Sequence, residues 1–279
     1  MNTTTIRTQT SRGRINRISE RPWRQYLLRA QRALPKFDYE TIDHHFCGMC
    51  GRIIQATGPV NLAIVDALDA RDHRLDNFPR RYNGAPSQEL LVIRENHKSG
   101  ERTLEPLRWG LIPYWCKDPK GGGRPINAMA ETVHLKPMFR EAYERRRCIV
   151  TVDGFFEWKA IKGKAKQPYA IAMKDGSPFG VAGLWENWKS PAGEWVRTFA
   201  IITTDSNELV GQIHDRMPVI LHRADYERWL GADADPRDLL RPFASEALRI
   251  WPISTRVNKP ENDAAAILDE VPAQAMEGI

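Results

Sequence analysis

Cys50 lies in the run Met49-Cys50-Gly51-Arg52 and has a thiol and a backbone nitrogen two carbons apart. If Met49 were the start of the protein and were removed, that nitrogen would be a free amine. Cys50 would then be a 1,2-aminothiol, which condenses with an aldehyde through its amine and closes a five-membered thiazolidine ring through its sulfur. The nitrogen of an internal residue is an amide and cannot form an imine. The chemistry of Cys50 therefore depends on whether the working chain begins at this residue.

Three other polar residues stand in apolar surroundings and could carry acid–base chemistry. Glu157 is flanked by two aromatic residues, and apolar neighbours raise the pKa of a carboxyl toward that of a general acid. Asn127 precedes an Ala-Met-Ala run, and His214 comes just before a predicted strand. Each also has a structural interpretation: Asn127 as a helix cap, Glu157 in an ion pair with Lys159, and His214 as a packed imidazole.

The composition is that of a folded protein with a net positive charge. The chain has 279 residues, 42% of them hydrophobic, and a formal net charge of +6. No apolar run approaches the roughly 18 residues that cross a bilayer, so we expect no membrane association. The positive charge favours a polyanionic partner without identifying it. Four cysteines in a chain of this length, with no secretory signal, indicate a reducing cytoplasm.

His44, His45, Cys47 and Cys50 are close enough in sequence to suggest a metal site. The second cysteine pair that a zinc ribbon needs is missing, so we expect neither a metal nor another cofactor.

The chain divides into three parts by composition. Residues 1–48 are rich in Arg, Ser and Thr and poor in acidic residues. They could be a disordered basic arm, a transit-like peptide, or translated sequence upstream of the true start at Met49, and the chemistry of Cys50 favours the third. Residues 49–267 have the pattern of a folded domain, and we expect 268–279 to be a flexible tail.

The folded part shows many short predicted strands and few predicted helices. We expect strands at 90–93, 107–112, 148–150, 155–158, 169–173, 180–184, 198–203 and 248–253. We expect helices at 61–68, at 127–147 with a break at Pro137, and at 224–230, and a Gly-rich loop at 117–125. No βαβ repeat supports a parallel sheet, so the prediction is a single α+β domain with a β-barrel-like, mostly antiparallel centre surrounded by helices.

Taken together, these residues lie in blocks that resemble the SOS-response-associated peptidase family, whose members act as abasic-site shielding proteins. The resemblance runs from Met49 to about Ile267. The blocks are Met49-Cys50-Gly51-Arg52, Tyr82-Asn83-Gly84-Ala85-Pro86-Ser87-Gln88, Arg108-Trp109-Gly110-Leu111-Ile112-Pro113, Asn127-Ala128-Met129-Ala130-Glu131-Thr132, Arg147-Cys148-Ile149-Val150, Gly154-Phe155-Phe156-Glu157-Trp158, His214-Asp215-Arg216-Met217-Pro218 and Ser254-Thr255-Arg256-Val257-Asn258.

The resemblance implies a protein that crosslinks to abasic sites in single-stranded DNA during the response to DNA damage. Cys50 would capture the aldehyde as a thiazolidine, and Asn127, Glu157 and His214 would line the site. An abasic-site lyase activity is also implied. Two alternatives remain: a thiol autopeptidase that removes its own leader, and a noncovalent single-strand binding module.

The resemblance also implies a DNA-binding surface on a protein that we expect to be a monomer, associated with the nucleoid when bound to DNA. Its expected residues are Arg52, Trp109, Trp115, Arg124, Arg140 and Arg216, with arginines pairing with phosphates and tryptophans stacking on exposed bases. The sequence departs from the family at Met129, where the family usually has Arg. Arg124 in the neighbouring loop is the candidate to make the phosphate contact that an Arg at position 129 would make.

Overall fold

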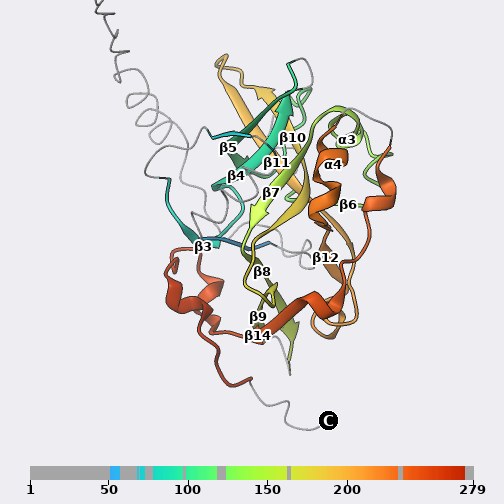
Figure 1. Ribbon diagram of the computed structural model, residues 1–279. Coiled ribbons are helices and arrows are strands. Elements are labelled where there is room, and N and C mark those ends of the chain that lie inside the picture. Colours follow the sequence, from blue (N-terminus) through green and yellow to red (C-terminus); the bar gives the residue numbers. More distant parts are fainter. Residues whose placement is uncertain are drawn as a thin grey trace, which may run out of the picture. The chain divides into compact units, whose positions relative to one another are not determined.

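The computed structural model describes residues 51–56, 68, 70–72, 78–96, 99–117, 124–161, 165–231 and 235–273, all within one compact unit, Cys47–Ile279. Two sheets dominate it (Figure 1). The larger contains β2 (Arg71–Asp72), β4 (Glu89–Asn96), β5 (Glu101–Trp109), β6 (Asn127–Met129), β7 (Arg147–Val152), β10 (Phe179–Lys189), β11 (Trp195–Asp205), β12 (Arg216–Pro218) and β13 (Ile220–Leu221). The smaller contains β1 (Ile53–Gln55), β3 (Arg81–Gly84), β8 (Gly154–Ala160), β9 (Lys166–Met173) and β14 (Leu248–Pro252).

Five strands of the larger sheet close into a barrel. The antiparallel pairs β5–β4, β4–β7, β7–β10 and β10–β11 are completed by a short parallel contact in which Thr198 and Phe199 of β11 lie opposite Arg108 and Trp109 of β5. The predicted barrel-like, mostly antiparallel centre is therefore confirmed.

Within the described residues the helices are shorter than the sequence predicted. In the described part of the chain the α-helices are α3 (Arg140–Arg145) and α4 (Tyr226–Leu230), beside several single 3₁₀ turns, including Val210–Gln212, Thr255–Asn258 and Ala265–Leu268. The prediction that helices surround the barrel was thus wrong. The predicted helix at 61–68 falls almost wholly outside the described residues, as does most of the Gly-rich loop.

The predicted helix at 127–147 is also wrong over its first half. Residues 127–129 form β6, which pairs in parallel with residues 201–203 of β11, and turns lead from there to α3. The backbone groups of β6 are satisfied by a partner distant in sequence, which overrides the helical spacing of its apolar residues.

Both faces of the barrel strands are buried, which explains their continuous hydrophobic runs. In β4, Leu90 and Val92 join one cluster of buried residues, while Leu91 and Ile93 join another that also contains residues of α3 and α4. We call the first the Trp109 cluster. It comprises Ile53, Leu90, Val92, Leu107, Trp109, Cys148, Val150, Val152, Phe155, Ile171, Phe179, Val181, Phe199, Ile201, Val210, Met217, Ile220 and Leu248.

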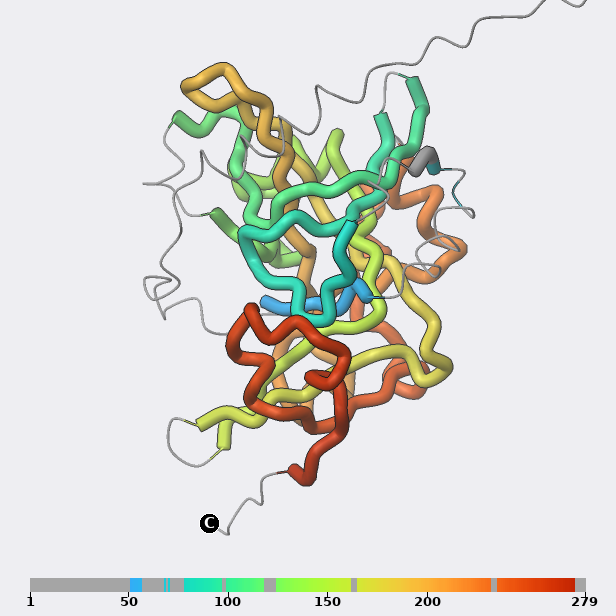
Figure 2. Tube along the Cα trace, turned by 90° about the vertical axis from the view of Figure 1, so that its left-hand side faces the viewer, coloured from blue at the N-terminus to red at the C-terminus, as the bar shows by residue number. Residues whose placement is uncertain are grey.

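The C-terminal segment folds back over the smaller sheet and beside β1 and β3 (Figure 2). The side-chain amide of Asn83 donates to the carbonyl oxygens of Val257, Lys259 and Asn262, each at 3.0 Å. Asn83 is fully buried, so these side-chain bonds hold the C-terminal segment in place as backbone bonds hold a pair of strands.

Candidate active site

Glu157 is the most unusual ionisable group that the structure describes. It lies in β8 on the same face as Phe155, a member of the Trp109 cluster, and is 2% exposed. Within the described residues its Oε1 atom has no hydrogen-bond partner. Burial raises the pKa of Glu157 to about 8, the backbone N–H of Trp158 opposes the shift, and the charge of Asp215 adds to it. Glu157 is therefore protonated at neutral pH and can give up a proton.

His214 follows the 3₁₀ turn Val210–Gln212, and its neighbours in sequence connect it with the surroundings of Glu157. Val210 and Met217, on either side of it in sequence, both belong to the Trp109 cluster, and the charge of its neighbour Asp215 acts on Glu157. The Nδ1 atom of His214 accepts a hydrogen bond of 3.0 Å from the backbone N–H of Arg216.

Asn127 reaches the same region from another element. It opens β6 opposite Ile201 of β11 and is 8% exposed. The next residue, Ala128, belongs to the cluster beneath the helices, so alternation along the strand directs Asn127 to the side of the Trp109 cluster. The structure thus brings Asn127, Glu157 and His214 to the edge of one buried cluster.

The described chain begins beside this group of residues. The carbonyl oxygen of Arg52 accepts a 3.1 Å hydrogen bond from the backbone N–H of Phe156, the residue before Glu157. The guanidinium of Arg52 donates to Asn83 Oδ1 at 2.8 Å and to the carbonyl oxygens of Val257 and Asn258 at 2.6 and 3.0 Å. These bonds hold the backbone at Arg52 and favour an anchoring role over the predicted phosphate contact. Cys50 itself lies outside the described residues.

The two tryptophans expected to stack on bases differ sharply. Trp109 is 1% exposed, stacks on Phe199 and donates its indole N–H to the carbonyl of Ile126. The prediction that Trp109 contacts DNA is wrong, because the closed barrel buries its ring. Trp115 is 52% exposed, so its ring is accessible for stacking on a base.

The expected arginines also differ. Arg140 is exposed at the start of α3, and Arg124 is half-buried beside Gly110, in a segment that pairs with the chain leading to Trp115. Both therefore remain candidates for phosphate contacts. Arg216 is instead held by Glu131 and Asp205, two residues that the sequence did not single out as its partners. They are 85 and 11 residues away, and no local pattern could have shown the pairing.

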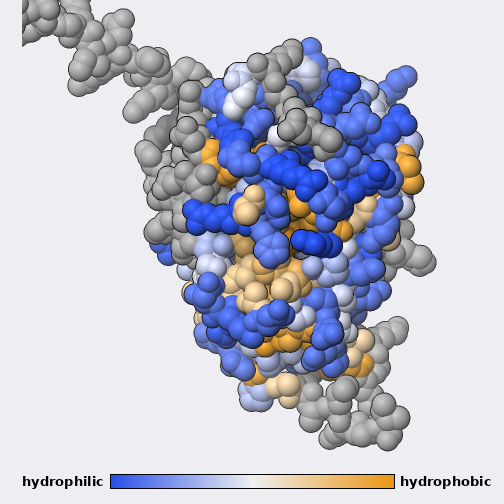
Figure 3. Space-filling model, turned by 45° about the vertical axis from the view of Figure 1, so that its right-hand side comes forward, coloured by the Kyte–Doolittle hydropathy of each residue, from blue (hydrophilic) through white to orange (hydrophobic). Residues whose placement is uncertain are grey.

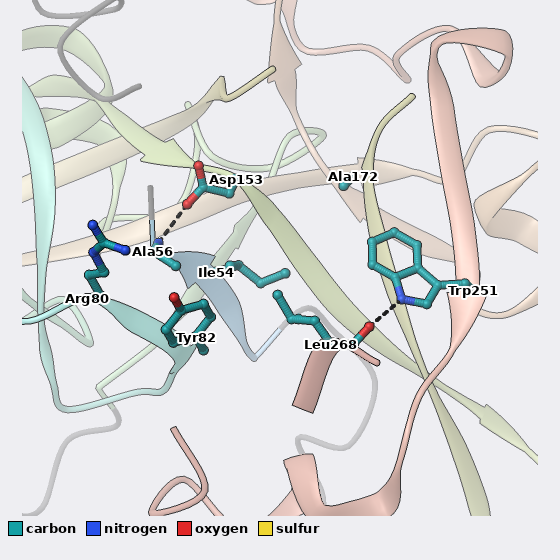
Figure 4. Close-up of a pocket in the computed structure, with 8 residues that line it drawn as sticks. All are labelled: Ile54, Ala56, Arg80, Tyr82, Asp153, Ala172, Trp251 and Leu268. Carbon is teal, nitrogen blue, oxygen red and sulfur yellow. Dashed lines mark hydrogen bonds between the residues drawn. The ribbon is translucent and has the colours of Figure 1, made fainter. Parts of the chain in front are cut away.

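Other potential sites do not add reactive groups to this arrangement. A cavity of about 230 Å³ is lined by Ile54, Ala56, Arg80, Tyr82, Asp153, Ala172, Trp251 and Leu268 (Figure 4). In it the Asp153 carboxylate accepts from the Ala56 amide, and the Trp251 indole donates to the Leu268 carbonyl. No set of three potential metal ligands occurs among the described residues. The cluster of His and Cys at 44–50 lies outside them.

The fold is a closed five-stranded barrel joined to a second sheet. A protonated glutamate, a histidine and an asparagine lie at the edge of one buried cluster in it, and this combination of fold and site points to one protein family. The family model described as SOS response associated peptidase (SRAP) matches residues 49–260, and the chain belongs to this family.

Curated relatives agree with the assignment. The chain is 44% identical over 192 residues to the abasic site processing protein YoqW of Bacillus subtilis, covering 67% of this chain and 85% of the relative. It is 30% identical over 230 residues to the abasic site processing protein YedK of Escherichia coli, covering 80% of this chain and 100% of YedK. A solved structure from Bacteroides thetaiotaomicron aligns with a TM-score of 0.71 at 29% identity, over 80% of this chain and 100% of that one.

Among the residues that the structure describes, no helix is both long enough and apolar enough to cross a membrane.

Proposed function

We propose that this protein processes abasic sites by crosslinking to them in single-stranded DNA, through Cys50 as its N-terminal residue. The observation that carries the proposal is Glu157, a buried carboxyl whose pKa is raised to about 8 and whose Oε1 atom has no partner in the described structure. The residue before it, Phe156, donates a backbone hydrogen bond to the carbonyl oxygen of Arg52. The relatives named abasic site processing proteins support it.

The reaction needs proton transfers that this site is suited to provide. The amine of Cys50 adds to the aldehyde carbon of the ring-opened sugar, and loss of water leaves an imine. The thiol then adds to the imine carbon and its proton passes to nitrogen, closing the thiazolidine with release of one water in total. Glu157 in its protonated form gives a proton to the departing hydroxyl, and His214 can protonate the sugar oxygen during ring opening.

Covalent geometry supports a role for residue 50 next to this carboxyl. Gly51 is bonded to Arg52, whose carbonyl is hydrogen-bonded to the residue before Glu157. Consecutive Cα atoms are about 3.8 Å apart, so the Cα atom of the residue before Gly51 can be no more than about 7.6 Å from that of Arg52.

The test is incubation with abasic single-stranded DNA followed by a denaturing gel. We expect a shifted covalent band from protein that begins at Cys50, and none from Cys50→Ala. Cys116→Ala is the matched control, since Cys116 is a half-buried free thiol outside the proposed site, and it should crosslink normally. A full-strength, heat-stable band from Cys50→Ala would end the proposal, and a shift seen only in native gels would favour the noncovalent binding module.

We also propose that the reactive form lacks residues 1–49. Protein started at Met49 should crosslink after removal of the initiator, whereas full-length protein with Met49→Pro, which blocks cleavage before Cys50, should not. The mass of each purified protein shows which N-terminus is present. An intact Met49→Pro chain that crosslinks equally well would exclude the N-terminal amine mechanism, and self-cleavage of the unmodified full-length chain would support autopeptidase activity.

A further inference from the structure

Two neighbouring aromatic side chains project from a short turn that follows the barrel strand β5. Tyr114 and Trp115 are 51% and 52% exposed. The turn covers residues 113–116, and a 2.9 Å bond from the backbone N–H of Cys116 to the carbonyl oxygen of Pro113 closes it. One bond of this kind stabilises a turn only weakly, so the orientation of the two rings depends on what holds the turn from outside.

The Cys116 end of the turn is held by the indole of Trp188 in β10. Its Nε1 atom donates a 2.6 Å hydrogen bond to the carbonyl oxygen of Cys116. Trp188 is only 6% exposed, and an indole nitrogen can donate but not accept, so the turn supplies the partner that this buried group needs. The two residues are 72 positions apart in the sequence, so the bond ties the turn to a distant strand.

The Tyr114 end is held by charged side chains. The guanidinium carbon of Arg146 lies 5.7 Å from the centre of the Tyr114 ring, and a hydrogen bond to Glu141 raises the pKa of the Tyr114 phenol. Arg146 in turn donates at 2.9 Å to Glu186, which is 2% exposed. Glu186 and Trp188 are two positions apart in β10 and therefore share one face of the strand. Both ends of the turn are thus attached to the same face.

Trp115 lies between these two attachments, with half of its surface open to solvent. A side chain on a loose turn loses conformational freedom when it stacks on a base, and this loss weakens binding. A turn that is already held at both ends has less freedom to lose, so it presents its exposed ring at a lower entropic cost.

We propose that Trp188 is a positioning residue, which acts through the Cys116 carbonyl to hold the 113–116 turn and so presents the Trp115 ring to a base of the bound DNA strand. The effect on DNA binding rests on the proposed function, whereas the effect on the rigidity of the turn does not.

The experiment compares Trp188→Phe with the matched control Trp185→Phe. Trp185 lies three residues away in the same strand, on the opposite face, and its indole N–H has no partner among the described residues. The same change of ring therefore removes a hydrogen bond at position 188 and none at position 185. Each substitution is made alone and together with Trp115→Ala, in protein that begins at Cys50.

Two quantities are measured. The first is the Kd for undamaged single-stranded DNA. The second is the heteronuclear ¹⁵N–¹H NOE of the backbone amides of residues 114–116, which reports motion of the turn on the picosecond-to-nanosecond timescale. In the wild type these NOE values should equal those of the β10 amides.

We expect Trp188→Phe to lower the NOE values of the turn and to weaken binding by about fivefold, the factor that one neutral hydrogen bond contributes. When Trp115 is already alanine, the same substitution should change the Kd by less than about twofold, because the turn then has no ring to present. A purely destabilising effect would weaken binding in both backgrounds. Trp185→Phe should match its parent in both quantities.

Three results would overturn the inference: low NOE values for the turn in the wild type, a Kd for Trp188→Phe within about twofold of the wild type, or an equal loss of affinity with and without Trp115. The wild-type NOE values require no variant, so they decide the matter even if Trp188→Phe fails to fold. If the wild type binds no single-stranded DNA, the proposed function fails, and the NOE values alone decide whether Trp188 holds the turn.

Discussion

At the scale of single residues, the decisive feature is a carboxyl group that the fold keeps out of water. Charged carboxylates are strongly solvated, so burial of Glu157 favours its neutral form. The two flanking aromatic residues predicted this raised pKa. The missing partner of Oε1 could not be predicted, because it depends on how segments distant in sequence pack around β8.

Glu157→Gln tests the proton-donor role. The amide keeps the shape of the side chain and cannot release a proton, so we expect crosslinking to slow by about 100-fold, the lower range for loss of a general acid. The Kd for undamaged single-stranded DNA should hardly change. The wild-type rate should fall as pH rises through about 8, where Glu157 ionises, and the variant should lack this decline. A variant with the wild-type rate and pH profile would show that Glu157 is structural.

The same pKa predicts how stability depends on pH. In the folded protein Glu157 keeps its proton up to about pH 8, whereas in the unfolded chain it ionises near 4.5. The folded state therefore binds more protons over this range, and its advantage is complete below pH 4.5 and is lost as pH rises to 8. Relative to Glu157→Gln, the wild-type free energy of unfolding should fall by a few kcal/mol between these limits. Urea unfolding of both proteins at several pH values measures this difference, and a constant difference would contradict it.

Substitutions of Trp109 and Trp115 should affect different properties, the first the stability of the fold and the second the binding of DNA. Trp109→Ala leaves a large void in the Trp109 cluster and should lower the free energy of unfolding by about 4 kcal/mol. Trp115→Ala should leave stability unchanged and weaken binding to single-stranded DNA by about tenfold, since a stacked base contributes a few kcal/mol at most. Trp195 is 57% exposed and has no proposed role, so Trp195→Ala is the control for both measurements. Equal affinities of the Trp115 and Trp195 variants would remove Trp115 from the DNA surface.

At the scale of elements, short segments distant in sequence hold one another in place by side-chain-to-backbone bonds. Gln55 in β1 exchanges two bonds with Leu91 of β4 and donates to the carbonyl of Thr151 in β7. Asn83 in β3 and Arg52 before β1 bind the carbonyls of the C-terminal segment. The smaller sheet is thereby tied both to the barrel and to the last part of the chain.

Asn83→Ala tests this arrangement. The change removes the Asn83 bonds to the carbonyl oxygens of Lys259 and Asn262, leaves Val257 only its bond from Arg52, and empties a fully buried position, so we expect the free energy of unfolding to fall by about 3 kcal/mol. Gln212→Ala, on an exposed turn, is the control and should be neutral within about 0.5 kcal/mol. Because Asn83 also accepts a bond from Arg52, the variant should crosslink more slowly even where it is fully folded. Unchanged stability would mean that the C-terminal segment is held by its apolar contacts instead.

At the scale of the whole molecule, hydropathy is unevenly distributed: on the face in Figure 3, hydrophobic residues gather in the middle, with hydrophilic residues around them. Residues 1–48 contain nine Lys and Arg against four Asp and Glu, which is +5 of the formal net charge of +6, so the rest of the chain is close to neutral. A DNA strand on the proposed surface would therefore depend on individual arginines and on stacking rather than on the overall charge.

Salt should therefore weaken noncovalent binding in proportion to the phosphates contacted. We expect a linear fall of log K with log salt concentration, and Arg140→Gln should reduce that slope by about one unit. Single-stranded DNA should bind better than intact duplex. Fluorescence anisotropy over a range of salt concentrations measures both, and equal reaction with an abasic site inside continuous duplex would contradict a single-strand surface.

The barrel strands could be predicted because their apolar runs are long enough to be buried on both faces, as in β4 and β11. β6 could not, since its three residues form a strand only through β11. Glu157 was marked by its aromatic neighbours, whereas Asn127 and His214 gained a predicted role only from the family resemblance. Trp109 was misassigned because an indole in a core and an indole on a surface look alike in sequence. The partners of Arg216 depend on topology alone.

The bonds from Arg52 to Val257 and Asn258 have a consequence for biosynthesis. A ribosome makes the chain from its amino end, so the anchor for the backbone next to Glu157 is synthesised some 205 residues before its partners. Until Val257 has emerged from the exit tunnel, Arg52 lacks these carbonyls and the backbone beside Glu157 is not held. The backbone beside Glu157 is thus fixed in place only when translation is nearly finished.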